Sequence, residues 1–181
     1  MPLTPLHYAV AYLVHRWRRE LSLPALIVSS MMPDADIVLT YFGTGGLQRR
    51  LLLHSLLAAS TLGVLLSILL TIFLYPAVIS PLFKLDRKMV EERCRFSSKL
   101  IVSCFIGCAT HVFLDSLHHE FNPLLYPFLN ESFDAFVLLN NWVYATTIIQ
   151  STFLTLSILI LIREIGKGTE NFWKRMLISA E

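Results

Sequence analysis

Long apolar stretches alternate with short charged segments along the whole chain. Three stretches contain no Lys or Arg: residues 20–48, 51–83 and 100–162. A helix needs about 20 mostly apolar residues to cross a bilayer, so each stretch is long enough to do so. The pattern therefore predicts an all-α integral membrane bundle of about four spans. The predicted spans are residues 21–41, 51–83, 100–117 and 137–162.

The second predicted span is too long for one straight crossing. As a helix, residues 51–83 would be roughly 50 Å long at 1.5 Å per residue, which exceeds the hydrocarbon core of a bilayer. The helix must therefore tilt, project from the bilayer, or end near Pro76 and Pro81, since proline disrupts a helix interior. The sequence leaves these alternatives open.

The segment ahead of the first span is predicted to be a short helix at or just inside the membrane interface. Residues 5–19, PLHYAVAYLVHRWRR, place aromatic side chains before a basic cluster, which is typical of interfacial helices. The segment is too short to span. Because no small-residue cleavage site follows it, we expect it to be retained and not removed as a signal peptide.

Basic residues predict the orientation. Residues 84–99 carry six basic and three acidic residues and the C-terminal tail is also basic, whereas residues 118–134 contain no Lys or Arg. Since Lys and Arg are enriched in cytoplasmic loops, we predict that residues 84–99 lie in the cytoplasm and residues 118–134 outside the cell membrane. Arg49 and Arg50 fall on the outer side against this rule, and phosphate binding would explain them.

Composition agrees with a membrane protein. The chain is 55% hydrophobic and 15% charged, with a mean hydropathy of +0.60, values far from those of a typical soluble domain. A net charge of +2, with the basic residues at span ends, gives no argument for nucleic-acid binding. We expect residues 1–181 to form one domain. Cys104 and Cys108 lie one helical turn apart in an apolar run and are expected to serve packing.

One face at the end of the third span carries His and Asp, side chains of the types that bind metals in proteins. The segment ATHVFLDSLHHEF covers residues 109–121. On a helix that turns about 100° per residue, Asp115 lies roughly 40° from His111, and His118 about 20° to the other side. These three side chains therefore share a face. His119, displaced by roughly 80° from His111, is interpreted as a loop residue or as a supporting residue.

Other segments bring polar groups to the same predicted membrane surface. Asp34 and Asp36 follow Pro33, and His54 begins the second span. An ionised Asp at the bilayer centre costs roughly 2.5–3.5 kcal/mol, so such groups must be paired, hydrated or bound to metal. Mixed His and Asp ligation suits a divalent ion such as zinc, and a water bound to such an ion is activated for hydrolysis.

Simpler interpretations stand beside the metal site. His111 and Asp115 can form a buried hydrogen-bonded pair, although His118 on the same face favours metal binding. Asp34 or Asp36 can end a helix in an ordinary Pro-Asp turn. By spacing alone, His7 is either a helix-end residue or a ligand. His15 beside Arg16 is expected at the interface.

The order of these motifs resembles a known family. A His near the start is followed by PDAD at 33–36, HS at 54–55, THVFLD at 110–115 and NPLLYPF at 122–128. This set resembles the membrane-bound metal-dependent hydrolases of the YdjM-like group. That group is similar to the zinc-dependent phospholipase C and P1 nuclease superfamily, all-α proteins that hold zinc ions with His and Asp and cleave phosphate esters. The similarity covers about residues 1–128.

The resemblance implies a set of metal ligands. These are His7, Asp34 or Asp36, His54, His111 and Asp115, with His118 as an addition. Many relatives have a His-Arg-Gly stretch before the HS pair, where this chain has RRLLL at 49–53. Because one histidine is missing, the resemblance implies a site for one or two metal ions in this chain instead of three.

The leading hypothesis is a metal-dependent hydrolase that cleaves a phosphoester in a lipid or isoprenoid headgroup at the outer membrane surface. Asp34, Asp36 and Asp115 are its predicted catalytic carboxylates, and Arg49 and Arg50 its predicted phosphate-binding residues. The alternative is a non-enzymatic membrane scaffold or partner-binding protein in which the same cluster is structural. A transporter is a third hypothesis, supported by polar residues in the last span: Asn140, Asn141, Thr146, Thr147 and Gln150.

Overall fold

The computed structural model describes residues 4–36, 52–129 and 131–179, and the regular elements in these ranges are all helices. The α-helices are α1 (His7–Trp17), α2 (Leu23–Ser29), α4 (Leu56–Ala58), α5 (Val64–Leu69), α6 (Tyr75–Phe83), α7 (Arg87–Arg93), α8 (Ser98–Ser116), α9 (Trp142–Gly166) and α10 (Phe172–Ile178). Turns of 3-10 helix are η1 (Thr4–Leu6), η2 (Met32–Asp34) and η5 (Leu138–Asn140), and π-helical turns are η3 (Ala59–Gly63) and η4 (Leu70–Leu74). The all-α prediction is confirmed for the described residues.

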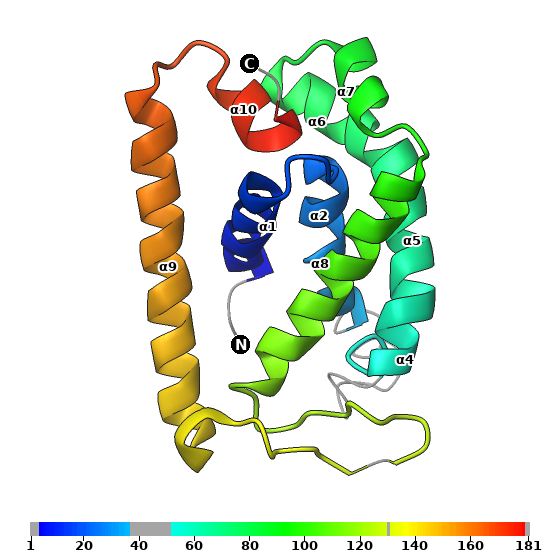
Figure 1. Ribbon diagram of the computed structural model, residues 1–181, viewed down its shortest axis with the longest axis vertical. Helices are drawn as coiled ribbons and strands as arrows, with labels where there is room; N and C mark the ends of the chain where they lie inside the picture. Colours follow the sequence, from blue (N-terminus) through cyan, green and yellow to red (C-terminus); the bar gives the residue numbers. More distant parts are fainter. Residues whose placement is uncertain (1–3, 37–51, 130, 180–181) are drawn as a thin grey trace.

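Three helices are long and apolar enough to cross a membrane: Leu56–Phe83, which runs from α4 to α6, then α8 and α9. They form the outer frame of the bundle (Figure 1). Large apolar side chains are exposed on all three, including Phe73, Phe105 and Ile162. Extended apolar surfaces of this kind mark contact with a membrane or with another protein. Helix α9, the third of these, begins at Trp142 and not at residue 137 as predicted. The Asn141 side chain caps its start by accepting hydrogen bonds from the amides of residues 143 and 144.

The longest helix passes through Pro76 and ends at Phe83. The π-helical turn η4 lies directly before α6, in which Pro76 is the second residue. Proline lacks an N–H, and its ring crowds the carbonyl four residues back; a π turn changes the local hydrogen-bond spacing and accommodates it. The helix stops where Lys84 adopts a left-handed conformation with φ of 53°. Pro76 therefore does not end this helix.

The prediction of a membrane span over residues 21–41 is wrong in its described part. Helix α2 contains only seven residues, which gives a length of roughly 10 Å. The turn η2, with Pro33 in it, follows directly. Leu23 and Leu26 are fully buried inside the bundle. The apolar character of this stretch thus reflects contact with protein, and hydropathy alone does not separate that environment from lipid.

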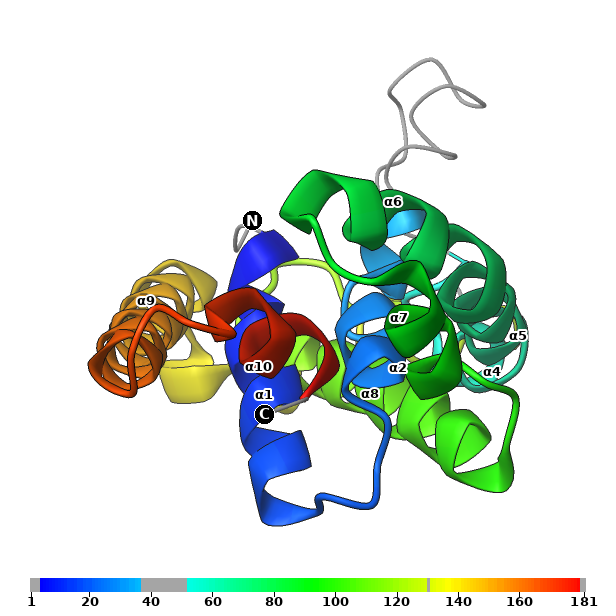
Figure 2. The same ribbon diagram turned by 90° about the horizontal axis from the view of Figure 1, so that it is seen from above.

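Helix α1 also lies inside the bundle, packed against other helices, whereas the sequence placed it at or just inside the membrane interface. It packs beside α2, between α9 on one side and α8 and α5 on the other (Figures 1 and 2). Ala9, Ala11 and Tyr12 are at most 3% exposed. The two small side chains allow neighbouring helices to approach closely, as in membrane helix packing. Among the large apolar side chains of α1, Leu13 and, at the basic end, Trp17 are exposed.

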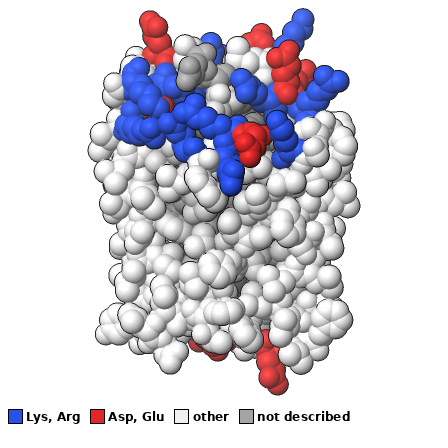
Figure 3. Space-filling model, viewed as in Figure 1, with Lys and Arg blue, Asp and Glu red and all other residues white. Residues whose placement is uncertain are grey.

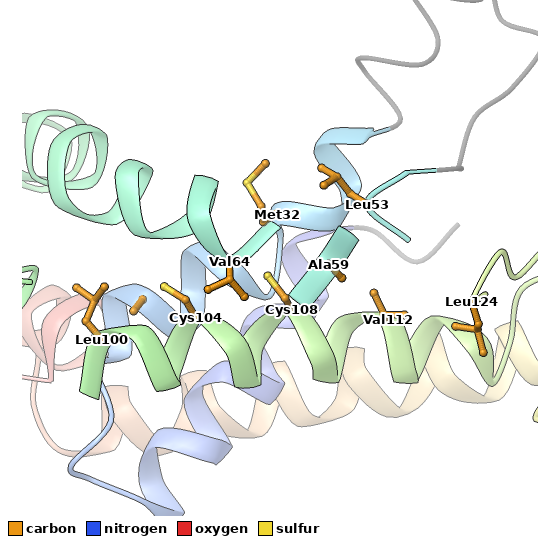
Figure 4. Close-up of a cluster of buried hydrophobic side chains, with 10 residues drawn as sticks. Met32, Leu53, Ala59, Val64, Leu100, Cys104, Cys108, Val112 and Leu124 are labelled. Atoms are coloured by element: carbon orange, nitrogen blue, oxygen red, sulfur yellow. The ribbon is translucent and has the colours of Figure 1, made fainter. Parts of the chain in front are cut away.

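An apolar stripe with a spacing of four residues fixes α8 against its neighbours. Leu100, Cys104, Cys108 and Val112 are buried along one side of α8 (Figure 4), as expected for side chains one turn apart. They belong to one core cluster that includes Val64 of α5. Cys104 and Cys108 therefore contribute to packing.

Charged residues gather at one end of the bundle. Figure 3 shows Lys and Arg at this end and a broad band without charged side chains next to it. We call this end, which contains residues 16–19, 84–99 and 163–175, the basic end. The opposite end, with the start of α4, the last turns of α8 and the start of α9, is called the site end.

Candidate metal centre

Histidine and aspartate side chains from four separate segments meet inside the site end. His7 begins α1, Asp34 lies in η2, His54 precedes α4, and His111 and Asp115 occupy the last turns of α8, followed by His118 and His119. The six members other than Asp34 are at most 9% exposed. A group of titratable side chains this deeply buried is expensive unless it is paired or binds an ion.

Four donor atoms surround one point. His111 Nε2 lies 3.3 Å from Asp115 Oδ2 and 3.6 Å from Asp34 Oδ1. His54 Nε2 lies 3.5 Å from the same Asp115 oxygen and 3.7 Å from the same Asp34 oxygen. In a tetrahedral zinc site with bonds of about 2.0–2.1 Å, neighbouring donors are roughly 3.3–3.4 Å apart. The spacing is therefore close to that of a zinc site, and this group could hold a metal ion.

The second oxygen of Asp115 faces a different set of imidazoles. Asp115 Oδ1 lies 3.5 Å from His119 Nε2, 3.8 Å from His7 Nε2 and 4.0 Å from His118 Nε2. Asp115, His118 and His119 form a second group with metal-binding spacing. The carboxylate of Asp115 thus stands between two clusters, with one oxygen toward each. This is how a bridging carboxylate lies between two ions about 3.5–4 Å apart.

Hydrogen bonds from the far side of the rings orient them toward the centre. His111 Nδ1 donates to the carbonyl of Ser30 at 2.7 Å, and His118 Nδ1 donates to the carbonyl of Leu114 at 2.8 Å. Because a carbonyl only accepts, Nδ1 carries the proton in both rings, and each Nε2 presents a lone pair to the cluster. Metal-binding histidines in proteins are held in the same way.

The protonation states match those of metal ligands. Burial, and then the neighbouring His111, lowers the pKa of His7 from 6.5 to about 4. Burial alone would raise the pKa of Asp34, but the hydrogen bond with His54 and the adjacent His111 bring it down to about 2. At neutral pH, His7 is therefore neutral and Asp34 is ionised, which are the forms that bind a metal.

Two of the histidines have buried nitrogens that nothing described satisfies. Both ring nitrogens of His7 and Nε2 of His111 make no hydrogen bond to the described residues. The His7 ring stacks on His111 with ring centres 4.1 Å apart and contacts the edge of Phe153. A buried polar atom without a partner costs free energy, and coordination to an ion would remove that cost.

Asp36 has a different position from the other predicted ligands. Its Oδ2 accepts a hydrogen bond from the Leu53 amide at 3.0 Å and lies 3.5 Å from His54 Nδ1. His54 directs its other nitrogen, Nε2, at Asp34 and Asp115. Asp36 therefore lies behind His54, where a carboxylate fixes the orientation of a metal-binding imidazole.

The structure brings together most of the predicted residues. His7, Asp34, His54, His111, Asp115 and His118 converge, with Asp36 directly behind them. Arg49 and Arg50, predicted to bind phosphate, lie outside the described residues. His119 is nearer the cluster than the sequence interpretation placed it. That interpretation measured angles from His111, whereas His119 is four residues from Asp115 and so lies on the same side as that carboxylate.

Neighbouring elements hold the cluster at depth within the bundle. Thr146 donates a hydrogen bond to the carbonyl of His118 at 2.6 Å, tying α9 to the end of α8. Phe153, which contacts His7, is eleven positions beyond the first residue of α9, or roughly 16 Å along its axis. The His7 side of the cluster therefore lies well inside the site end of the bundle. Thr146 was one of the polar residues that supported the transporter hypothesis, and the structure shows it in a hydrogen bond between helices.

A family model matches almost the entire chain: the domain of unknown function DUF4184, over residues 1–179. The chain belongs to the DUF4184 family. No curated protein and no solved structure matches the sequence. The DUF4184 match includes the His and Asp cluster, the three long helices and the basic end, so these features lie within one family unit.

Proposed function

We propose that the chain is an integral membrane protein of the cell membrane, with the basic end in the cytoplasm and the cluster in the outer half of the bundle. Three long apolar helices and the concentration of Lys and Arg at one end support this orientation. Residues 100–162, which include the site end of α8 and α9, contain no Lys or Arg. Membrane lipids are then the immediate surroundings of the cluster.

The cluster is proposed to hold one or two divalent ions, with zinc as the best match to the donor set. Asp34, His54, His111 and one oxygen of Asp115 would hold the first ion. The other oxygen of Asp115, with His7, His118 and His119, would hold a second ion. When bound, zinc supplies an activated water and Lewis acidity for hydrolysis.

The proposed activity is hydrolysis of a phosphoester in a lipid or isoprenoid headgroup. The bridging position of Asp115 between two imidazole sets carries this proposal, because paired metal sites are common in phosphoester cleavage. The resemblance of the motifs to metal-dependent membrane hydrolases supports the same reaction class. The side chains of Asp34 and His119 are the most exposed of the cluster, at 10% and 11%, so a substrate that approaches from the η2 side meets Asp34 first. Asp34 then positions the attacking water and accepts its proton.

An apolar groove beside Asp34 fits the chain of a lipid substrate. Met32 and Ala35, which lie within two residues of Asp34 in the chain, line a cavity of about 310 Å³. The cavity continues between α2 and the long helix past Leu70, Leu74 and Val78. Because α2 and this helix are antiparallel, the groove leads from the cluster toward the middle of the bundle. An acyl or isoprenoid chain whose phosphate lies at Asp34 would follow that path.

Elemental analysis of the detergent-purified protein tests the metal site, and release of phosphate or phosphomonoester from lipid substrates tests the activity. We expect zinc at one to two equivalents per chain and metal-dependent turnover that stops on chelation and returns with zinc. Protein that folds and contains no divalent metal, and binds none when zinc is added, would contradict the proposal.

Replacing Asp36 with alanine is expected to weaken zinc binding by about 10–100-fold, the usual effect of losing a carboxylate that orients a metal-bound histidine. Titration with a competing zinc chelator measures the affinity. Asp134→Ala is the matched control, because Asp134 is exposed in the loop at the site end and should leave the affinity unchanged. Equal affinity in Asp36→Ala and the parent chain would remove Asp36 from the site.

Replacing Ala35 with phenylalanine is expected to obstruct the groove. The specificity constant for a long-chain lipid phosphoester should fall about tenfold, while a short soluble ester with the same headgroup changes by less than about twofold. Leu82→Phe is the control, since Leu82 is exposed on the same long helix outside the groove. Parallel losses for both esters would show that Ala35 affects the centre itself and not chain binding.

A structural metal centre in a membrane scaffold is the second candidate, favoured by the nearly complete burial of the histidines. Asp34→Asn separates the two functions. If the protein is a hydrolase, the Asp34→Asn variant loses turnover while it retains most of its thermal stability. In a scaffold, the parent chain shows no turnover, and removal of metal lowers the melting temperature.

A further inference from the structure

Besides the apolar groove, a polar cavity lies at the basic end, far from the His and Asp cluster. Its volume is about 700 Å³. The walls come from the end of α1, the α1–α2 connection, the α7–α8 connection, the end of α9, and α10. Seven basic and three acidic residues line it. Positive-inside bias explains the sign of the charges at this end, but it does not explain why so many converge on one hollow.

Two of the basic side chains are paired with the buried carboxylate of Glu164. Glu164 is buried, and its carboxylate accepts hydrogen bonds from Tyr12, Lys167 and Arg175. Arg175 is further held by the carbonyls of Gly168 and Glu170. Lys167 and Arg175 are therefore committed to Glu164, and the Glu164 charge is compensated within the protein. It does not offset the other basic residues around the cavity.

Five basic side chains around the cavity have no such partner. Arg16, Arg19, Arg93, Arg95 and Lys99 line the cavity and make no hydrogen bond or ion pair to the described residues. They come from two regions that are distant in sequence, residues 16–19 and 93–99. Glu20 and Glu92 also line the cavity and reduce the excess to three positive charges (five minus two). Like charges brought together in this way repel each other, and a bound anion would offset them.

The walls are held in fixed positions relative to each other. Ser22 donates through Oγ to the carbonyl of Arg93 at 3.2 Å and through its amide to Ser103 Oγ at 2.9 Å. His15 joins Leu21 and Ser179 through its two ring nitrogens, at 2.9 Å and 2.7 Å. The two basic regions are therefore placed opposite each other by the fold, which makes the cavity a preorganised site for an anion.

We propose that this cavity binds a phosphate group, held between the Arg16–Arg19 region and the Arg93–Lys99 region. Arginine from two sides suits phosphate, because its planar fork donates two parallel hydrogen bonds to phosphate oxygens. The cavity lies at the basic end, and Figure 3 shows that this end adjoins the uncharged band of the bundle, so the phosphate belongs either to an anionic lipid headgroup or to a soluble phosphorylated compound. This site is independent of the proposed hydrolase activity.

Binding to two probes distinguishes these sources. The intact protein is placed in phosphatidylcholine nanodiscs with or without phosphatidylglycerol, or titrated with glycerol phosphate in nanodiscs of phosphatidylcholine alone. Melting temperature and saturable binding are measured. A rise with phosphatidylglycerol alone identifies a headgroup site, a rise with glycerol phosphate alone identifies a soluble ligand, and a response to both identifies phosphate as the shared determinant. No saturable response to either probe overturns the proposal.

Paired variants show whether the cavity is responsible. Arg93→Gln with Arg95→Gln should weaken binding at least about tenfold. Arg163→Gln with Lys174→Gln removes the same charge at the same end, outside the cavity, and should change binding less than about twofold. The single variant Lys99→Gln should give an intermediate loss. Equal losses in the two double variants would mean that only the overall charge attracts anions, and would overturn the site.

Discussion

An Asp115→Asn chain is expected to lose both metal ions and at least about 10²–10³-fold of its hydrolytic rate, the loss that follows removal of one group that stabilises charge in a transition state. Asparagine preserves the size of the side chain but has one oxygen and no charge, so it cannot bridge the two imidazole sets. Asp115 contacts both groups, His54 and His111 through Oδ2 and His7, His118 and His119 through Oδ1. Zinc content and phosphate release from lipid measure the outcome.

Two comparisons make this result specific. Asp134→Asn, an exposed carboxylate at the same end, should keep full zinc content and activity. His119→Ala should lose the second ion while retaining the first, because His119 lies only on the Oδ1 side of Asp115. Unchanged zinc in Asp115→Asn would exclude Asp115 as a ligand of either ion and would overturn the proposed metal centre.

The part of the candidate site on α8 could be predicted because a single helix determines its own geometry. The spacing of His111, Asp115 and His118 places them on one face whatever surrounds the helix. The same rule would have included His119 if angles had been measured from Asp115 as well. The contributions of His7 and Thr146 follow from contacts between helices, which no periodicity within one segment encodes.

The fold could be predicted at the long helices and not at the short ones. Residues 100–117 and the segment ending at Phe83 were expected from apolar length, and the structure has helices there. Residues 5–19 and 21–41 were assigned to the interface and to a span, yet α1 and α2 lie inside the bundle. Lipid and protein interior select the same apolar residues, so only packing partners distinguish the two environments.

Gly107 determines how closely α2 approaches α8, and through that contact it places His111. A Cβ at this position would lie 1.8 Å from Ser29 Oγ, 2.9 Å from Ser29 Cβ and 3.0 Å from the backbone nitrogen of Ser30. The carbonyl of the same Ser30 accepts the hydrogen bond that orients His111. Any side chain at Gly107 must therefore push α2 away and weaken this hydrogen bond.

Gly107→Ala is expected to cost about 1–3 kcal/mol of unfolding free energy, the range for an overpacked core, and to lower the melting temperature by roughly 2–12 °C. Zinc affinity should fall as well, since the Ser30 carbonyl no longer fixes the His111 ring. Thermal denaturation and chelator competition in detergent measure the two effects. Ser29→Ala in the same chain removes the closest contact and should recover part of the stability.

Two other glycines in helices provide the controls. At Gly63 the nearest atoms to an added Cβ are 3.5 Å away, and at Gly166 nothing lies within 4 Å. Alanine at either position should be neutral or stabilising by up to about 1 kcal/mol, because it reduces the freedom of the unfolded chain and favours the helix. If Gly107→Ala behaves like these two variants, α2 does not depend on close contact with α8, and the hydrogen bond from His111 to Ser30 does not depend on that glycine.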